Sequence, residues 1–302
     1  MLIKLNKFFK KQRKKIGGKF RRYSVNINPR IYRPGSSPFI SGDTLRKEAI
    51  FIFDETQTFK PSQVKNNDLV FMKSDLKNIY FKIIHPQIES KYILISHNSD
   101  EEINDKDKNL VDDKIVHWFA QNLAILNNNK FSAIPIGFEN RRYLNNGKLN
   151  NLKKIEKHQT SKNNMILSSY NSATNFDLRS NLDDIVKEIE TIDNKIFATP
   201  KEYLLNLSNY KFLLCPEGNG IDTHRIWEGL LTKTVPIVKK SSFAENFYNL
   251  GIPILLIENW SDLKKFDENK IEALYEDFTD FDFLKFVKKK FWLDLINEKK
   301  MI

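Results

Sequence analysis

Short apolar runs alternate with amphipathic stretches along this chain, which is the pattern of an α/β protein. In the first half, apolar runs predict buried strands over residues 49–53, 68–72, 92–96 and 131–136. Apolar residues at helical spacing predict a helix over residues 115–125, between the last two strands. Because alternating strands and helices form parallel sheets with helices on both faces, we expect such a sheet here.

The second half shows the same alternation after a polar, Lys/Asn-rich stretch over residues 145–164, which is typical of a linker. The predicted strands are 165–167, 212–214, 235–238 and 254–257. Helices are predicted over 179–190, 200–207, 270–278 and 281–296, and a further helix begins at Asp222 or Thr223. We therefore divide the chain into a tail (1–24), two Rossmann-like domains (25–150 and 151–280) and a C-terminal helix (281–302), with a cleft between the domains.

Composition agrees with a globular protein of this size. The 302 residues are 40% hydrophobic, and no apolar run approaches the ~20 residues of a membrane-spanning helix. The single cysteine, Cys215, excludes an intrachain disulfide, so a reducing compartment is the simpler expectation. We interpret Cys215 as a small packed residue rather than a nucleophile.

The net charge of +11 is concentrated at the N-terminus. Residues 1–22 contain ten of the 49 basic residues and no acidic one, which leaves 39 basic against 38 acidic residues in the rest of the chain. Leu2, Leu5, Phe9 and Ile16 fall near helical spacing, so we expect a basic amphipathic helix that binds an anionic membrane surface. A disordered basic tail is the alternative, and nucleic-acid binding is less favoured because no recognisable nucleic-acid module follows.

The most informative chemistry lies in residues 210–238, where a strand, a glycine-bearing loop, a helix and a second strand follow one another. Ligands of open α/β sheets bind at the carboxyl ends of such strands. The helix N-terminus and Arg225 suit a phosphate, and Glu228, on the same helix face as Arg225 and His224, can accept hydrogen bonds from ribose hydroxyls. An ordinary surface ion pair between Arg225 and Glu228 is the alternative.

This segment resembles the donor-binding signature of exostosin-type glycosyltransferases and their bacterial surface-polysaccharide relatives, and more loosely that of the α1,3-fucosyltransferases. The resemblance rests on Cys215-Pro216, the loop at 218–220, Arg225, Glu228 and the strand 235–238. A second stretch, residues 92–143, contains ILISHNSDE, HWFAQNL and IPIGFENRRY and is similar to the N-terminal half of bacterial members.

The resemblance implies a GT-B fold in which Glu228 holds the ribose and Arg225 the diphosphate of a nucleotide-sugar donor. It also implies that the loop 217–222 lines the donor sugar, and it favours inversion at the anomeric carbon. The donor-binding candidates are Arg179, Gly218, Asn219, Gly220, Asp222, Thr223, His224, Arg225 and Glu228. The candidate catalytic bases are Asp100, His97 and Glu217, and the acceptor-side candidates are Asn98, Glu139 and Asn140. Any of these strand-end residues can instead cap a turn or a helix.

We expect no metal and no cofactor, because the Asp-x-Asp pairs at 105/107 and 280/282 lie in polar or helix-like context and the five histidines lack ligand spacing. The expected activity is transfer of a sugar from a nucleotide sugar to a surface-polysaccharide, lipopolysaccharide or lipid-linked acceptor. We expect the protein in the cytoplasm, peripheral to the inner membrane, without a nucleic-acid partner. A non-catalytic sugar-nucleotide or glycan-binding module, and a nucleic-acid-associated protein acting through its basic tail, are the alternatives.

Overall fold

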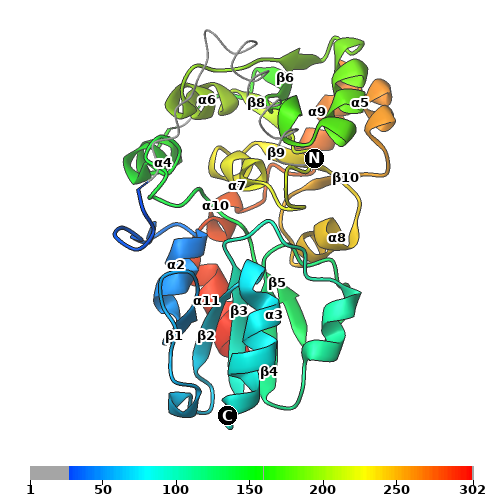
Figure 1. Cartoon of the computed structure of the whole chain (residues 1–302). Helices are drawn as coiled ribbons and strands as arrows, with labels where there is room; N and C mark the ends of the chain where they lie inside the picture. Colours follow the sequence, from blue (N-terminus) through cyan, green and yellow to red (C-terminus); the bar gives the residue numbers. More distant parts are fainter. Residues whose placement is uncertain (1–26, 159, 301–302) are drawn as a thin grey trace, which may run out of the picture.

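The computed structural model describes residues 27–158 and 160–300, so the predicted basic helix at 1–24 lies outside the described residues. The chain forms two five-stranded sheets, one in each half, and every pair of neighbouring strands is parallel (Figure 1). Helices pack against these sheets. The arrangement confirms the predicted α/β fold with two Rossmann-like domains, as in a GT-B architecture.

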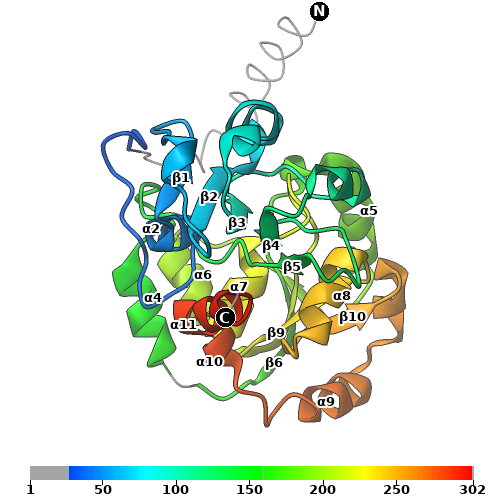
Figure 2. The same ribbon diagram turned by 90° about the horizontal axis from the view of Figure 1, so that it is seen from below.

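The first sheet has its strands in sequence order. They are β1 (Phe51–Phe53), β2 (Leu69–Lys73), β3 (Tyr92–His97), β4 (Ile115–Ala120) and β5 (Phe131–Ala133). This sheet contains no reversal of strand order among the described residues. One face is covered by α2 (Gly42–Glu48), as Figure 2 shows. The other is covered by α3 (Lys77–Ile79), the π-helix η3 (Tyr80–Ile84) and the 3₁₀ helix η4 (His85–Gln87).

The predicted helix at 115–125 is wrong, because its first part is strand β4. Trp118, Phe119 and Ala120 are all buried, since β4 lies between β3 and β5 and is covered on both faces. A strand buried on both faces has no polar alternation, so its apolar pattern cannot be told from that of a buried helix.

The second sheet has the order β10-β9-β8-β6-β7. Its strands are β6 (Asn164–Ser168), β7 (Ile192–Asn194), β8 (Tyr210–Leu214), β9 (Val235–Lys239) and β10 (Leu255–Ile257). After β7 the chain returns to the opposite side of β6, so the strand order reverses between β6 and β8. Such a reversal is a topological switch point, where the loops after two adjacent strands diverge and leave a crevice.

The helices of the second domain agree well with the sequence predictions. They are α5 (Phe176–Lys187), α6 (Pro200–Leu207), α7 (His224–Leu231), α8 (Ser242–Asn249) and α9 (Glu268–Glu276). The prediction for α6 is confirmed at both ends, and α8 was missed. The remaining short turns are η1 (Pro61–Gln63), η2 (Ser74–Leu76), η5 (Asp105–Leu110), η6 (Ser172–Thr174) and η7 (Trp260–Lys265).

Two segments differ from the prediction. The expected linker at 145–164 contains a helix, α4 (Leu149–Glu156), which buries Leu152 and Ile155. The two apolar side chains, three positions apart, define a buried face that the many Lys and Asn residues around them obscure.

The expected single helix at 281–296 is two helices, α10 (Phe283–Phe286) and α11 (Lys289–Glu298). The chain is extended at Lys288, which forms an antiparallel bridge with Phe39. Helix α11 then lies against the first domain, where Lys289 pairs with Glu48 of α2 (Figure 1). Its Trp292 also contacts Trp227 of α7, with ring centroids 5.8 Å apart. None of the helices within 27–158 and 160–300 is long and apolar enough to cross a membrane.

Candidate functional site

The carboxyl ends of both sheets face a common cavity of about 670 Å³, which we call the main cavity. Its first-domain wall consists of residues that follow β2, β3, β4 and β5: Lys73, Asp75, His97, Asn98, Ser99, Asp100, Glu101, Gln121, Ile136, Glu139, Asn140, Arg142 and Tyr143. Its second-domain wall follows β6 and β8: Asn171, Thr174, Arg179, Gly218, Asn219, Gly220, Asp222, Thr223, His224 and Arg225. The second wall therefore lies at the topological switch point, where open α/β sheets bind ligands.

A second cavity of about 750 Å³, the side cavity, adjoins the first on the side of the second domain. It is lined by Glu139, Asn146, Ser169, Tyr170, Asn171, Ser172, Ile196, Phe197, Pro200, Tyr203, His224, Arg225 and Glu228. Glu139, Asn171, His224 and Arg225 line both cavities. A ligand extending from one cavity to the other passes these four residues.

Helix α7 begins where the sequence predicted. Thr223 is the N-cap, with extended backbone (φ −132°, ψ 139°), and its hydroxyl accepts from the Arg225 amide at 3.5 Å. Gly218 and Asn219 line the main cavity in the loop before it. A Cβ at Gly220 would lie 2.8 Å from Nδ2 of Asn122, whose side chain is held by the Ser99 carbonyl and the Asp222 amide, so this close approach of the two domains favours glycine.

Arg179 holds the two loops of the switch point together. From α5 it donates to three backbone carbonyls, of Glu217 (Nε, 2.8 Å), Asn171 (Nη1, 2.8 Å) and Pro216 (Nη2, 2.9 Å). Its guanidinium also lies over the Tyr170 ring, 5.3 Å from the centroid. The sequence suggested that Arg179 reaches a phosphate, and the structure adds that it fixes both loops around that position.

Arg179 and Arg225 place two positive charges beside one another. Burial, and then the charge of Arg225, lower the pKa of Arg179 to about 10. Arg225 Nε donates to the Ser169 carbonyl at 2.6 Å. Among the described residues the guanidinium groups of both arginines are directed to backbone carbonyls, and neither forms a salt bridge with a carboxylate there. Arg225 in the first turn of α7, with Arg179 beside it from α5, favours an anion where the two cavities meet.

Glu228 lies one turn after Arg225 and lines the side cavity. Its direct ion pair with Arg225, the alternative interpretation of the sequence, does not form among the described residues, because Arg225 is directed to Ser169. Burial raises the pKa of Glu228, and the charges of Arg225 and His224 oppose that rise. Glu228 thus presents a carboxyl group to the side cavity.

Asp222 joins the two domains, which changes the role expected for it in donor binding. Its Oδ2 accepts from the Ile136 amide at 2.6 Å, and its Oδ1 accepts from Trp227 Nε1 at 3.1 Å. The Asp222 amide donates to Asn122 Oδ1 at 2.9 Å. Burial raises the pKa of this carboxyl to about 7. A buried carboxyl held by these donors is a structural link and lies poorly for contact with a phosphate.

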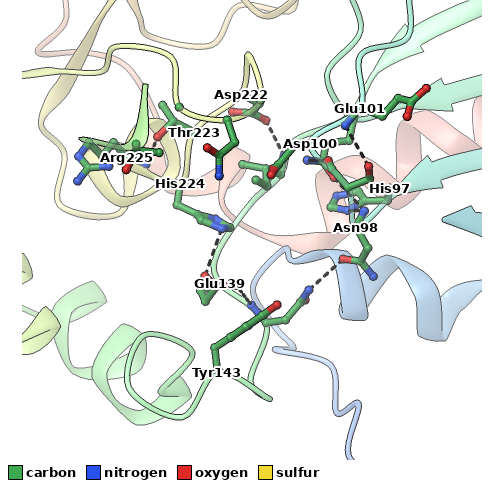
Figure 3. A pocket seen from close by; sticks show the side chains of 18 of the residues that line it. His97, Asn98, Asp100, Glu101, Glu139, Tyr143, Asp222, Thr223, His224 and Arg225 are labelled. Carbon is green, nitrogen blue, oxygen red and sulfur yellow. Dashed lines mark hydrogen bonds and ion pairs between the residues drawn. The ribbon is translucent and has the colours of Figure 1, made fainter. Parts of the chain in front are cut away.

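His224 also reaches the first domain. Its Nδ1 donates to the Gly137 carbonyl at 2.6 Å, and its Nε2 lies 3.7 Å from Oε2 of Glu139. Figure 3 shows the two side chains pointing toward each other from opposite walls. Burial lowers the pKa of His224, but the Glu139 carboxylate and the Gly137 carbonyl outweigh it and raise the pKa above its ordinary value.

His97 is unsuited to act as the catalytic base, contrary to the sequence expectation. Its Nε2 donates to the Pro135 carbonyl at 2.8 Å, and its Nδ1 accepts from the Asn98 amide at 2.7 Å. Burial lowers its pKa to about 4. With both ring nitrogens occupied and the ring 1% exposed, His97 has no free lone pair for an acceptor hydroxyl.

The other two base candidates differ in placement. Glu217 does not line the main cavity, and its backbone carbonyl accepts a hydrogen bond from Arg179. Burial and the nearby Glu102 raise the pKa of Glu217, and Lys239 opposes this. Asp100, in contrast, is exposed at the wall of the main cavity. Of the three residues proposed from sequence, Asp100 is the one whose position fits a base.

Asn98 and Asn140 are fixed by a partly buried network on the acceptor side. Asn98 has a left-handed backbone (φ 62°), and its Nδ2 donates to Oδ1 of Asp43 at 3.1 Å. Asn140 Nδ2 donates to Asn98 Oδ1 at 2.9 Å, and the Asp43 amide donates to Asn140 Oδ1 at 2.8 Å. A Cβ at Gly42 would lie 1.9 Å from Asn98 Oδ1. Asp43 is paired in turn with Arg33 at 2.7 Å.

Sequence reasoning missed two groups of residues at the site. Ser169 to Ser172 directly follow β6, and the strand-end argument applied after β8 could have identified them. Phe197, which precedes α6, and Tyr203, within it, carry no local signal, because they reach the side cavity only in the folded chain.

The Asp-x-Asp residue Asp107 forms a salt bridge with Lys77 at 2.9 Å, and Asp105 forms one with Lys108 at 2.6 Å. Within 27–158 and 160–300, no group of three or more His, Cys, Asp or Glu side chains is placed to hold a metal ion. Metal independence stays a prediction.

No protein-family model and no curated protein matches the sequence. Among solved structures, the OtsA apo structure is 10% identical with a TM-score of 0.45, covering 79% of this chain and 74% of its own. The pneumococcal O-GlcNAc transferase GtfA, in complex with UDP and GlcNAc, is 11% identical with a TM-score of 0.39, and the match covers 78% of this chain and 57% of GtfA. The spinosyn rhamnosyltransferase SpnG is 9% identical with a TM-score of 0.33, and the match covers 77% of this chain and 68% of SpnG. These likenesses are too distant to assign a function, which therefore rests on the geometry of the site.

Proposed function

We propose that this protein is a glycosyltransferase that moves a sugar from a nucleoside-diphosphate sugar to a glycan or lipid-linked acceptor. The observation that supports it best is the pair Arg179 and Arg225 beside the N-terminus of α7, at the switch point between β6 and β8. Phosphate groups bind at helix N-termini with arginine donors, and the same groups stabilise a diphosphate that leaves the anomeric carbon.

The two cavities give the donor and the acceptor separate places. The diphosphate lies where the cavities meet, with the nucleoside in the side cavity and the transferred sugar in the main cavity, against the loop at 217–222. The acceptor then approaches along the first-domain wall, past Asn98 and Asn140. Of the four carboxylates on this wall, Asp75 and Glu101 are paired with lysines. The other two, Asp100 and Glu139, are the candidates that remove the proton of the acceptor hydroxyl as it attacks.

The remaining features of the proposal follow from the sequence. Transfer proceeds with inversion and without a metal, since arginines and the helix terminus supply the positive charge. The acceptor is a surface polysaccharide or lipopolysaccharide, and residues 1–22 bring the enzyme to an anionic membrane surface. Deleting residues 1–22 reduces co-sedimentation with phosphatidylglycerol vesicles; unchanged co-sedimentation contradicts the membrane role.

Saturation-transfer NMR tests the donor site directly. The full chain is titrated with nucleoside diphosphates and their sugars, with and without EDTA. A nucleotide or nucleotide sugar that binds the wild-type protein in the presence of EDTA but does not bind the Glu228→Ala variant supports a metal-independent donor site. Absence of binding to every nucleotide contradicts the proposed function.

A further inference from the structure

The loop after β5 carries an arginine whose charge has no partner in the part of the chain that the structure describes. Arg142 lines the main cavity on the first-domain wall and does not line the side cavity. Its Nε is buried and has no hydrogen-bond partner among the described residues. Buried polar atoms in folded proteins nearly always have a partner, so this guanidinium is suited to a ligand.

The four carboxylates that share this wall leave Arg142 unpaired. Asp75 and Glu101 each pair with a lysine, at 2.7 Å and 3.4 Å. Glu139 is directed to a histidine on the opposite wall, at 3.7 Å. The fourth, Asp100, is exposed to solvent. Since none of the four neutralises it, Arg142 presents a free positive charge to the acceptor side of the main cavity.

The loop that carries Arg142 holds the guanidinium in place. Its Cζ lies over the Tyr143 ring, 4.4 Å from the centroid, and Figure 3 shows Tyr143 at the wall of the cavity. The Tyr143 amide donates to the Asn140 carbonyl at 2.9 Å, and the Gly147 amide donates to the Tyr143 carbonyl at 2.8 Å. A Cβ at Gly147 would collide with the Asn140 carbonyl, so the loop closes tightly around this glycine. A planar guanidinium stacked on a ring loses little freedom when its N–H edge binds an oxyanion.

Two amide groups on the same wall add neutral donors. Asn98 Nδ2 donates one hydrogen to Asp43, and Asn140 Nδ2 donates one to Asn98. An amide nitrogen carries two hydrogens, so each has a further N–H that these contacts leave free. Both asparagines line the main cavity with Arg142. A carboxylate or phosphate oxygen is the acceptor that such a set of donors favours.

We propose that the first-domain wall contains an anion subsite in which Arg142 binds a carboxylate or phosphate group of the acceptor, so that the enzyme glycosylates an acidic sugar and not a neutral one. This inference rests on the proposed function, which places the acceptor on this wall, and it narrows the substrate class. The donor diphosphate is held by Arg179 and Arg225 on the opposite wall, so the two anionic groups have separate arginines.

Titration of the ¹⁵N-labelled full chain with methyl β-D-glucuronide, glucose 6-phosphate and the neutral methyl β-D-glucoside tests it. The donor site is first filled with the nucleoside diphosphate that binds best, in a buffer free of phosphate. The Nε–Hε resonance of Arg142, identified by its absence from Arg142→Lys, reports the contact. We expect an anionic probe to shift this resonance and to bind about 10- to 100-fold more tightly than the neutral glucoside. A response to the glucuronide alone identifies a carboxylate, and one to glucose 6-phosphate alone identifies a phosphate.

Variants at two adjacent arginines show whether the preference comes from Arg142. In Arg142→Gln it falls to within about threefold, because the charge-assisted contact is lost. Arg142→Lys keeps the charge without the planar fork and retains part of the preference. Arg141→Gln is the matched control and keeps the wild-type preference, because Arg141 Nη1 donates to the Gly35 carbonyl at 3.3 Å and its side chain does not line the main cavity.

The outcomes separate the two proposals. Failure of every nucleoside diphosphate to bind overturns the proposed function, and with it the acceptor role of Arg142. Nucleotide binding with equal affinity for charged and neutral glycosides overturns the anion subsite alone, as does a preference that Arg142→Gln leaves unchanged. A loss of nucleotide affinity in Arg142→Gln as large as in Arg225→Ala places Arg142 on the donor and also overturns the subsite. A wild-type unfolding temperature for Arg142→Gln shows that a changed preference comes from the lost guanidinium.

Discussion

His224 Nε2 lies 3.7 Å from Glu139 Oε2, and this contact joins helix α7 of the second domain to the loop after β5 of the first. The two residues line both cavities. The second ring nitrogen of His224 is held by the Gly137 carbonyl. The pair therefore fixes the relative position of the donor-side and acceptor-side walls at the point where the cavities meet.

Replacing Glu139 by Gln is expected to lower the pKa of His224. The groups that face this imidazole are Glu139, Glu228, Asp222 and, from β3, His97. Burial favours the neutral imidazole, and the Glu139 charge favours the protonated one. Removing that charge therefore lowers the pKa of His224. NMR titration of the His224 ring measures the change. Glu190→Gln, an exposed glutamate outside both cavities, is the control, and an unchanged His224 midpoint in Glu139→Gln contradicts the pairing.

Arg225→Ala is expected to weaken binding of nucleoside diphosphates by about 10- to 100-fold, because a charge-assisted contact to phosphate is lost. Binding of the corresponding nucleoside should change much less. Isothermal titration of both ligands measures the difference. Arg225→Lys, which keeps the charge, should lose less, and Arg30→Ala removes an exposed arginine as a control. Equal losses for nucleoside and diphosphate would mean that Arg225 acts on the loop at Ser169 and makes no contact with the phosphates.

The proton acceptor is expected to be Asp100, whose carboxylate is exposed at the main cavity. Asp100→Asn should lower kcat by about 10²- to 10⁴-fold with little change in donor affinity, because it removes a proton acceptor and leaves the phosphate contacts in place. Steady-state kinetics with the donor found by NMR measure this. The reverse result, a near-normal Asp100→Asn and an inactive Glu139→Gln that still binds nucleotide, assigns the role to Glu139. Asp184→Asn, on the exposed face of α5, is the control.

The strand–loop–helix–strand unit at 210–239 could be predicted closely because its signals are local. Thr223 is a good N-cap, and the apolar runs on either side of the helix are short and bounded by Pro216 and Lys239. Strand β4 could not be separated from a helix because both of its faces are buried. The division of α10 from α11 depends on the pairing of Lys288 with Phe39, which no local pattern shows.

The sequence pointed to residues on both walls, since Asn98, Asp100 and Glu139 line the main cavity as Arg225 does, but it could not show what these residues contact. Arg225 and Glu228 stand out because they share a helix face behind a glycine loop, which sequence spacing reveals. The partners on this helix come from distant segments: Arg225 contacts Ser169, which is 56 positions away, and His224 contacts Gly137, which is 87 positions away. The role of His97 was misjudged for the same reason, because its hydrogen bond to Pro135 spans 38 positions. Spacing along a chain indicates which side chains share an element, and the fold decides which of them remain free to react.

The last prediction concerns His97 and Asp222, two buried groups whose effects on stability have opposite signs. Burial lowers the pKa of His97 to about 4, whereas the unfolded histidine titrates near ~6.5. The unfolded chain therefore binds more protons in this interval, and the stability contributed by neutral His97 is lost as pH falls from ~6.5 toward 4. Burial raises the pKa of Asp222 to about 7, against ~3.9 unfolded, so its contribution is present at low pH and is lost as pH rises toward 7.

The free energy of unfolding of His97→Gln, relative to wild type, should therefore rise as pH falls from 6.5 to 4, by up to about 1.4 kcal/mol per pH unit. That of Asp222→Asn, relative to wild type, should instead rise as pH increases from 4 to 7. Urea unfolding at pH 7, 6 and 5 measures both slopes against wild type. Parallel curves for the histidine variant and wild type would mean that His97 titrates normally in the folded protein, and would return it to the candidates for the catalytic base.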